Sequence, residues 1–195
     1  KMKKKKIFLY NMILESLKRR LMCLKWRNSF LLSFLLFTFY AQATEIHISS
    51  ESEPLLISNQ MSVFLDTTEN LSIEEAANKS ELFSRNYTDV INAQVTSSTV
   101  WLKFQIENKT NLNELLLEIR TSNIDEVTLY KQEDDHFSSE GPYGQAFLYN
   151  TRFYNHPNFL FTLNLRSGEQ ATYYLRVKNQ DQITLPIQVG SRKSI

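Results

Sequence analysis

Residues 98–110 read "STVWLKFQIENKT" and contain the alternation that decides the fold. Successive side chains of a β-strand point to opposite faces, and here every second residue from Val100 to Ile106 is apolar. The intervening positions are polar except for Trp101, which has the largest aromatic side chain of the segment. The stretch therefore predicts a half-buried strand whose polar face also carries one large aromatic residue.

The same period of two recurs in other short segments, which are bounded by turn residues. Together with the first segment they predict strands over residues 45–49, 55–65, 100–107, 115–120, 126–130, 158–165, 172–178 and 183–189. The segment 55–65 contains Ser58 and Asn59, which favour a turn, so it is expected to form two short strands. Ser72 lies three residues before Glu75, a capping-box spacing that predicts one short helix.

About eight short strands, one short helix and no alternation of strands with long helices are typical of an all-β fold. We expect an antiparallel β-sandwich or jelly roll. Two stretches, residues 81–98 and residues 131–152, are expected to be mostly irregular. Long loops on rigid β scaffolds often carry functional residues, so the second stretch is a candidate binding loop or lid.

The first 43 residues differ from the rest of the chain. They contain ten basic residues and a single acid, Glu15, and they end with the apolar run "SFLLSFLLFTFYAQA". A basic start, a short apolar stretch and a small-x-small end predict a secretory signal peptide, with Met22 as its expected start and cleavage before Thr44. The run is shorter than the roughly 20 residues of a membrane span, and the alternative is an uncleaved amphipathic anchor.

Cleavage changes the charge of the chain. The full sequence has 22 basic and 21 acidic residues, of which residues 44–195 keep 12 and 20, so their net charge is −8. Binding of nucleic acid needs a clustered basic face, and we expect no nucleic-acid partner. The exported part has no cysteine and must be stabilised by its core alone, for which about 150 residues suffice in one domain.

The sequence offers no recognisable catalytic or phosphate-binding motif. Its three histidines, His47, His136 and His156, are far apart, whereas a zinc site needs three or four converging ligands. The acidic run "EDDH" at residues 133–136 has oxygen ligands for calcium, but a solvated turn is the favoured interpretation. We therefore expect no catalytic residue, no metal ion and no cofactor.

Two further segments share the pattern of the first. In "LLLEIR" (residues 115–120) and "TYYLRVK" (residues 172–178), an apolar face is backed by a face of mixed aromatic, basic and acidic residues. Aromatic rings beside arginine forks suit sugar rings or carboxylates. The alternative is that a loop covers this face as a second small core. If the three strands lie in one sheet, the mixed face collects Trp101, Lys103, Glu118, Arg120, Tyr174 and Arg176.

Four segments together resemble one protein family: "VWLKFQIEN", "LLLEIRTSNIDEVTLY", "GPYGQAFLYNTR" and "TYYLRVKNQDQITLPIQV". Their order is similar to that of the type 2 extracellular domain of bacterial seven-transmembrane receptors with diverse intracellular signalling modules (7TMR-DISM). The resemblance extends from about residue 58 to residue 189. Carried over position by position, it marks Trp101, Asn108, Asp125, Tyr130, Gly144, Arg152 and Arg176.

The resemblance implies a jelly-roll sandwich similar to carbohydrate-binding modules, exported to the periplasm and held at the outer face of the inner membrane. Such a domain binds a carbohydrate or another small ligand and passes the signal through a seven-helix membrane region to a cytoplasmic output module. We accordingly expect a leader over residues 1–43, an N-terminal strand region over 44–57, the sensor domain over 58–189 and a truncated linker to the membrane region over 190–195.

The expected function is that of a non-catalytic, extracytoplasmic ligand-sensing domain. One alternative is a protein–protein interaction or assembly module, in which the mixed face packs on another protein. A second alternative is a carbohydrate-active enzyme or its accessory module. In that case Glu118 and Asp125, which are expected to lie on adjacent strands, would be within about 5 to 10 Å of each other. The ligand-binding residues are predicted to be Trp101, Lys103, Glu118, Arg120, Asp125, Tyr130, Arg152, Tyr174 and Arg176.

Overall fold

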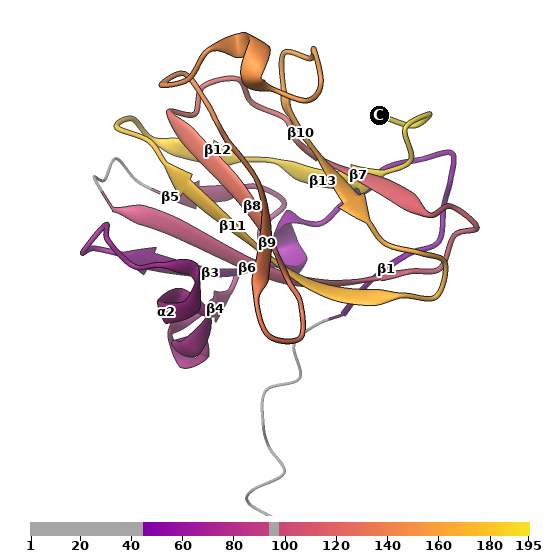
Figure 1. Cartoon of the computed structure of the whole chain (residues 1–195), viewed down its shortest axis with the longest axis horizontal. Helices are drawn as coiled ribbons and strands as arrows, with labels where there is room; N and C mark the ends of the chain where they lie inside the picture. The colour runs from indigo at the N-terminus through magenta and orange to yellow at the C-terminus, as the bar shows by residue number, and fades with distance from the viewer. Residues whose placement is uncertain (1–44, 94–97) are drawn as a thin grey trace, which may run out of the picture. The chain divides into compact units, whose positions relative to one another are not determined.

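Two β-sheets form the two layers of the folded part of the chain (Figure 1). The computed structural model describes residues 45–93 and 98–195, and the predicted leader lies outside them. One sheet has seven strands and the other has four, while two further strands pair separately. The prediction of an all-β, sandwich-like fold with one short α-helix is confirmed.

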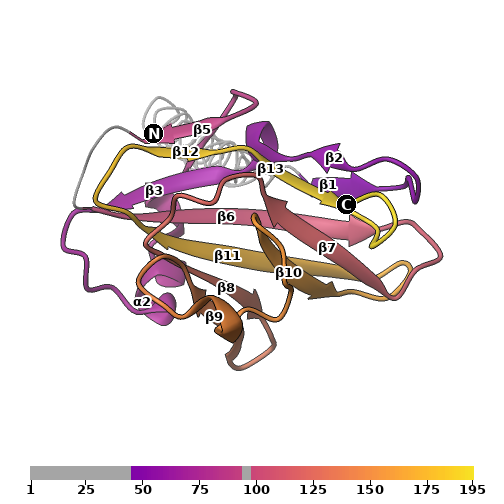
Figure 2. The ribbon, with the colours of Figure 1, turned by 90° about the horizontal axis from the view of Figure 1, so that it is seen from above.

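The larger sheet is organised around β6, its longest strand. Figure 2 shows the central strands of this sheet running side by side. A seventh strand, β1 (Glu45–Ile48), pairs in parallel with the C-terminal half of β6, next to the antiparallel β3. The other six strands are, in sheet order, β4 (Ser84–Arg85), β3 (Ser62–Asp66), β6 (Thr99–Asn108), β11 (Gln170–Lys178), β8 (Glu126–Gln132) and β9 (Phe137–Tyr143).

The smaller sheet and the separate pair share one continuous segment of chain. The segment 183–189, predicted as a single strand, is divided at Pro186, which cannot donate a ladder hydrogen bond. β12 (Ile183–Leu185) precedes this proline and pairs with β5 (Ile91–Ala93). The smaller sheet consists, in order, of β10 (Phe159–Asn164), β7 (Glu114–Ile119), β13 (Ile187–Gly190) and β2 (Leu55–Leu56).

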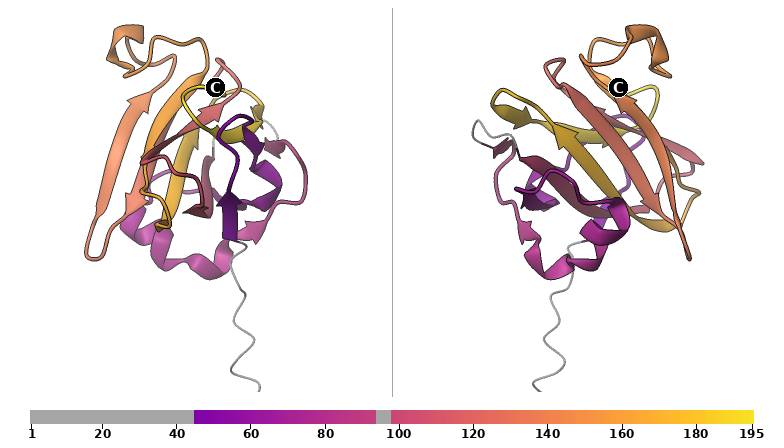
Figure 3. Two further views of the ribbon diagram at one scale, coloured as in Figure 1. Left: turned by 90° about the vertical axis from the view of Figure 1, so that its right-hand side faces the viewer. Right: turned by 60° about the vertical axis from the view of Figure 1, so that its left-hand side comes forward.

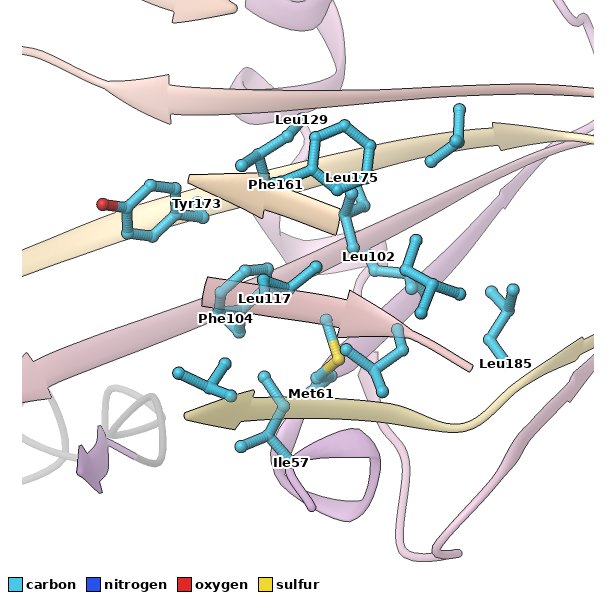
Figure 4. Close-up of a cluster of buried hydrophobic side chains, with 14 of the residues drawn as sticks. Ile57, Met61, Leu102, Phe104, Leu117, Leu129, Phe161, Tyr173, Leu175 and Leu185 are labelled. Atoms are coloured by element: carbon cyan, nitrogen blue, oxygen red, sulfur yellow. The ribbon is translucent and has the colours of Figure 1, made fainter. Parts of the chain in front are cut away.

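The main core lies between the two sheets, and side chains from both sheets meet there (Figure 4). Phe104 of β6 stacks on Tyr173 of β11 with ring centroids 5.5 Å apart. Tyr143 of the larger sheet stacks on Phe161 of the smaller sheet at 5.4 Å, so aromatic contacts also join the layers. The predicted apolar face of β6 is confirmed by the burial of Val100, Leu102, Phe104 and Ile106.

The single α-helix of the described residues, α2 (Ile73–Asn78), begins at the predicted capping box. The Ser72 hydroxyl accepts a hydrogen bond from the Glu75 N–H at 3.3 Å, and the Glu75 carboxylate accepts one from the Ser72 N–H at 2.9 Å. Such caps satisfy backbone donors at the start of a helix. Figure 3 shows α2, in purple, on the side of the larger sheet away from the smaller one.

The stretch 131–152, expected to be irregular, is largely a β-hairpin. β9 lies within it and pairs antiparallel with β8, and the turn of the hairpin is closed by a hydrogen bond from the Glu133 N–H to the His136 carbonyl at 2.9 Å. The sequence of β9, "FSSEGPY", has no apolar alternation, and Pro142 fits only an edge strand. What remains irregular is the β9–β10 loop, residues 144–158, which includes a single 3₁₀ turn, η3 (Tyr149–Thr151). The stretch 81–98 likewise contains β4 and β5.

Candidate functional site

The nine residues predicted to bind a ligand fall in separate places. The mixed face required three strands in one sheet, and this condition is not met, because β7 belongs to the smaller sheet. Glu118 therefore lies on the outer face of the smaller sheet, and Arg120 directly follows its strand. Asp125 directly precedes β8, and Arg152 lies in the β9–β10 loop. The larger sheet carries the other five, Trp101, Lys103, Tyr130, Tyr174 and Arg176.

Aromatic residues gather on the outer face of the larger sheet and form a second small core. α2 packs on this face through Ile73 and Ala76, which are buried together with Trp101 and Tyr174. Four partly buried aromatic residues complete this outer aromatic cluster: Phe64, Phe83, Tyr130 and Phe137. The sequence left two interpretations of the mixed face, an open ligand-binding surface or a second small core covered by the chain. On the larger sheet, the structure shows the covered core.

Trp101 is completely buried in the outer aromatic cluster. Its ring lies 6.0 Å from that of Tyr130, tilted by 35°. Its Nε1–H group has no hydrogen-bond acceptor among the described residues, and a buried donor without a partner costs about 1–3 kcal/mol. The indole thus contributes packing and presents no open face on which a sugar ring can stack.

Two basic side chains border the outer aromatic cluster. The Lys103 ammonium lies 5.6 Å from the centre of the Tyr174 ring, and burial lowers the pKa of Lys103. The Arg176 guanidinium forms an ion pair with the carboxylate of Glu126 on β8. Burial also raises the pKa of the Tyr130 hydroxyl. Lys103 has no ion-pair partner among the described residues, and its side chain is half-buried beside aromatic rings.

Glu118 is held by two amides on the outer face of the smaller sheet. It is only 6% exposed, and its carboxylate accepts hydrogen bonds from Asn158 Nδ2 at 2.7 Å and from Gln188 Nε2 at 2.6 Å. Asp125 is engaged elsewhere, since its carboxylate accepts a hydrogen bond from the Gln180 N–H at 2.8 Å. The expectation that Glu118 and Asp125 lie on adjacent strands is wrong, because β7 and β8 belong to different sheets.

The β9–β10 loop covers the outer face of the smaller sheet. The Tyr154 hydroxyl lies 2.9 Å from the hydroxyl of Thr162 on β10, and the Arg192 guanidinium lies 5.3 Å from the centre of the Tyr154 ring. Arg192 also forms an ion pair with Glu114 at 2.8 Å. Leu116 on this face is also buried, although it points away from the main core. Both outer faces of the sandwich are therefore partly covered by the chain itself.

The β9–β10 loop also exposes large apolar side chains, and Figure 1 shows it in orange at the top of the domain. Leu148 is 74% exposed, Tyr149 50% and Phe153 73%. The Arg152 guanidinium lies between rings, 4.9 Å from the centre of Tyr149 and 4.2 Å from that of the buried Phe159. Sequence reasoning included Arg152 but missed Tyr149 and Phe153. The available signal was the density of aromatic residues in "FLYNTRFY".

The sequence of the chain matches one known family. The family model described as 7TMR-DISM extracellular 2 matches residues 58–191, which is more than half of the chain. The chain belongs to this family. The resemblance that the four sequence segments indicated is thereby confirmed. None of the curated proteins compared with the chain matches it.

As a 7TMR-DISM extracellular domain, the chain is a sensor domain of the kind found outside the membrane in seven-transmembrane receptors. Such receptors include a membrane region and an output module in their full length. No helix in residues 45–93 or 98–195 is long and apolar enough to cross a membrane.

Two residues that the 7TMR-DISM resemblance marks have structural roles here. Asn108 is fully buried, and its Nδ2 donates to the carbonyls of Leu112 at 2.8 Å and Leu165 at 2.7 Å. Gly144 has φ +148°, and a Cβ atom there would lie 2.0 Å from the Asp125 carbonyl oxygen. Both residues therefore fix turns at the ends of strands, and neither offers a free group to a ligand.

Proposed function

We propose that this 7TMR-DISM domain is a non-catalytic ligand-sensing module, exported to the periplasm and held at the outer face of the inner membrane. It binds a carbohydrate or another small ligand, and the signal passes to the seven-helix membrane region and the cytoplasmic output module of the full-length receptor. The receptor family supports this context. The net charge of −8 on residues 44–195 also argues against a nucleic-acid partner.

One observation carries our choice of the binding place: the β9–β10 loop exposes Tyr149 and Phe153 next to the partly exposed Arg152. Open aromatic rings stack on the apolar faces of sugar rings, and a guanidinium donates paired hydrogen bonds to hydroxyl or carboxylate oxygens. The outer aromatic cluster has similar residue types but no open indole. Among the nine residues predicted from the sequence, Arg152 is thus the one we assign to direct contact with the ligand.

The test is calorimetric titration of residues 44–195, which belong to the compact unit of residues 43–195, with a panel of oligosaccharides and small carboxylates. For the ligand that binds, Phe153→Ala is expected to weaken affinity at least about fivefold, since an aromatic hot-spot contact is worth more than about 1 kcal/mol. Tyr87→Ala is the matched control, because Tyr87 is 79% exposed and also lies beside an arginine, Arg85, at 5.3 Å. Binding that tolerates Phe153→Ala but is lost in Trp101→Phe would instead assign the site to the larger sheet.

A second candidate function is a protein–protein assembly module. The observation that favours it is the clustering of Leu148, Tyr149 and Phe153 on one loop, because contiguous exposed apolar side chains often mark interaction surfaces. Sedimentation of residues 44–195 over a range of concentrations separates the two functions. Self-association that Leu148→Asp abolishes favours assembly, whereas a monomer that still binds its small ligand favours sensing.

A further inference from the structure

We propose a metal-binding site at the parallel junction of β1 and β6, formed by Glu45, His47 and Glu107, which takes a divalent transition-metal ion such as Zn²⁺. Each of the three side chains offers one ligand atom, and these atoms all lie within 4.8 Å of one another. The site uses none of the residues of the β9–β10 loop, so this proposal does not rest on the proposed function.

The backbone pairing brings the three residues together. The parallel register of β1 and β6 sets His47 directly opposite Glu107. Alternate residues of a strand share a face, so Glu45 lies on the same face as His47. Sequence spacing did not indicate this set, because Glu107 is far from the other two along the chain. The expectation of no metal ion rested on the wide spacing of the histidines along the sequence, and strand pairing brings distant residues together.

Existing contacts already converge on one carboxylate oxygen. His47 Nδ1 lies 2.7 Å from Glu107 Oε2, and Lys109 Nζ lies 3.0 Å from the same oxygen. Around a tetrahedral zinc ion with bonds of about 2.1 Å, ligand atoms are roughly 3.4 Å apart. All three proposed ligands are at least partly exposed, so small side-chain rotations are sufficient to reach this spacing.

The donor set selects the class of metal. One imidazole nitrogen with two carboxylates suits zinc or a similar transition metal, whereas magnesium and calcium prefer oxygen ligands alone. Three protein ligands leave a fourth position for water. Gln170 of β11 donates a hydrogen bond to the Glu45 carboxylate and thereby orients one ligand. Lys109 is expected to weaken metal binding, since its ammonium competes with the metal ion for the Glu107 carboxylate.

Metal binding has a structural consequence for the edge of the larger sheet. β1 comprises only residues 45–48, and it lies outside the range that the family model matches. An ion bridging His47 and Glu107 joins β1 to the central strand β6 through side chains as well as backbone. We therefore expect zinc to stabilise the attachment of this strand in addition to filling a coordination site.

The experiment titrates the full chain carrying Cys23→Ser with zinc, in competition with a chromophoric chelator at neutral pH. The cysteine is replaced because a thiolate is itself a zinc ligand. One ion is expected to bind per chain. His47→Gln is expected to weaken zinc binding at least tenfold, and Gln170→Ala about tenfold, the typical loss for an outer-shell partner. Lys109→Gln is expected to strengthen it about two- to fivefold, because it removes a competing surface ion pair.

His136→Gln is the matched control, since His136 is an exposed histidine on the β8–β9 turn. Far-UV circular dichroism checks that each variant retains the fold. Zinc binding that is weakened by His47→Gln and unaffected by His136→Gln supports the site. The proposal is overturned if the chain shows no saturable binding at sub-millimolar zinc, or if His47→Gln and His136→Gln have equal effects.

Discussion

Arg176 lies directly opposite Trp101 in the antiparallel pairing of β11 with β6, yet its guanidinium pairs with Glu126 on the next strand. The two residues that most suggested a sugar-binding face are therefore neighbours with separate roles. Trp101 is buried beneath α2, and Arg176 neutralises a carboxylate within the same sheet. Side-chain types that suit a ligand thus serve structural roles here, Trp101 in packing a helix on the sheet and Arg176 in an ion pair between two strands.

The burial of Trp101 predicts its fluorescence. In residues 44–195 it is the only tryptophan, because the other one, Trp26, precedes residue 44. We expect a blue-shifted emission maximum and little quenching by iodide, since the indole has no exposed surface. Steady-state emission spectra with and without quencher are the measurement. A red-shifted and readily quenched signal would show that α2 does not cover the ring in solution.

The outer aromatic cluster should contribute measurably to stability. Trp101→Ala is expected to lower the free energy of unfolding by about 3–5 kcal/mol, the usual cost of removing a buried aromatic side chain. Leu82→Ala is the control, because Leu82 is 49% exposed and a surface change costs less than about 0.5 kcal/mol. Urea unfolding of both variants measures the difference. Similar losses in the two variants would contradict a packed second core.

Removal of the Tyr173 hydroxyl and of the Tyr143 hydroxyl should affect the stability of the domain differently. Tyr173 is buried and its hydroxyl has no partner among the described residues, so Tyr173→Phe is expected to stabilise the domain by about 1 kcal/mol or leave it unchanged. The Tyr143 hydroxyl donates to Glu140 Oε1 at 3.2 Å, so Tyr143→Phe is expected to destabilise by about 1 kcal/mol. Thermal unfolding of both variants tests the pair. Destabilisation of equal size would imply that Tyr173 has an acceptor.

Glu140 should make stability depend on pH. Burial raises the pKa of its carboxyl, while hydrogen bonds from the Thr162 N–H and the Tyr143 hydroxyl act in the opposite direction. Because the folded pKa lies above the unfolded value of about 4.3, the folded state binds more protons between these two pH values. The stabilising contribution is fully present below about pH 4.3 and is lost as pH rises through the folded pKa.

Glu140→Gln removes this titration. Between about pH 4 and neutrality, the free energy of unfolding of the unaltered protein should therefore fall more steeply with rising pH than that of Glu140→Gln. Urea unfolding at a series of pH values measures both slopes, with the exposed Glu53→Gln as control. Parallel curves for the unaltered protein and Glu140→Gln would mean that Glu140 titrates alike in the folded and unfolded states.

Local structure could be predicted from the sequence where a segment carried a clear pattern, such as apolar alternation or a capping box. The alternation in β6 identified its core face, and the Ser72–Glu75 spacing located the start of α2. Alternation shows which residues share a face but not which sheet a strand joins, so Glu118 was grouped with Trp101 although β7 lies in the other layer. β9 escaped notice because an edge strand with Gly141 and Pro142 has no apolar period.

The candidate sites were harder to predict for a different reason. Exposure depends on which distant segment folds over a face, and the covering of Trp101 by α2 has no signature within β6 itself. The exposure of Phe153 and the meeting of His47 with Glu107 likewise depend on pairings between segments far apart in the chain. Contacts of this kind depend on the order and pairing of the strands. Alternation of apolar residues along a strand does not determine that order.

The β9–β10 loop joins an edge strand of the larger sheet to an edge strand of the smaller one. At this seam the Glu140 carboxylate of β9 accepts a hydrogen bond from the Thr162 N–H of β10 at 3.0 Å. A displacement of the loop is consequently shared between both layers, whereas a displacement of the β8–β9 turn stays within one sheet. If the loop holds the ligand as we propose, ligand binding would act on the relative position of the two sheets, which is a mechanical output rather than a chemical one.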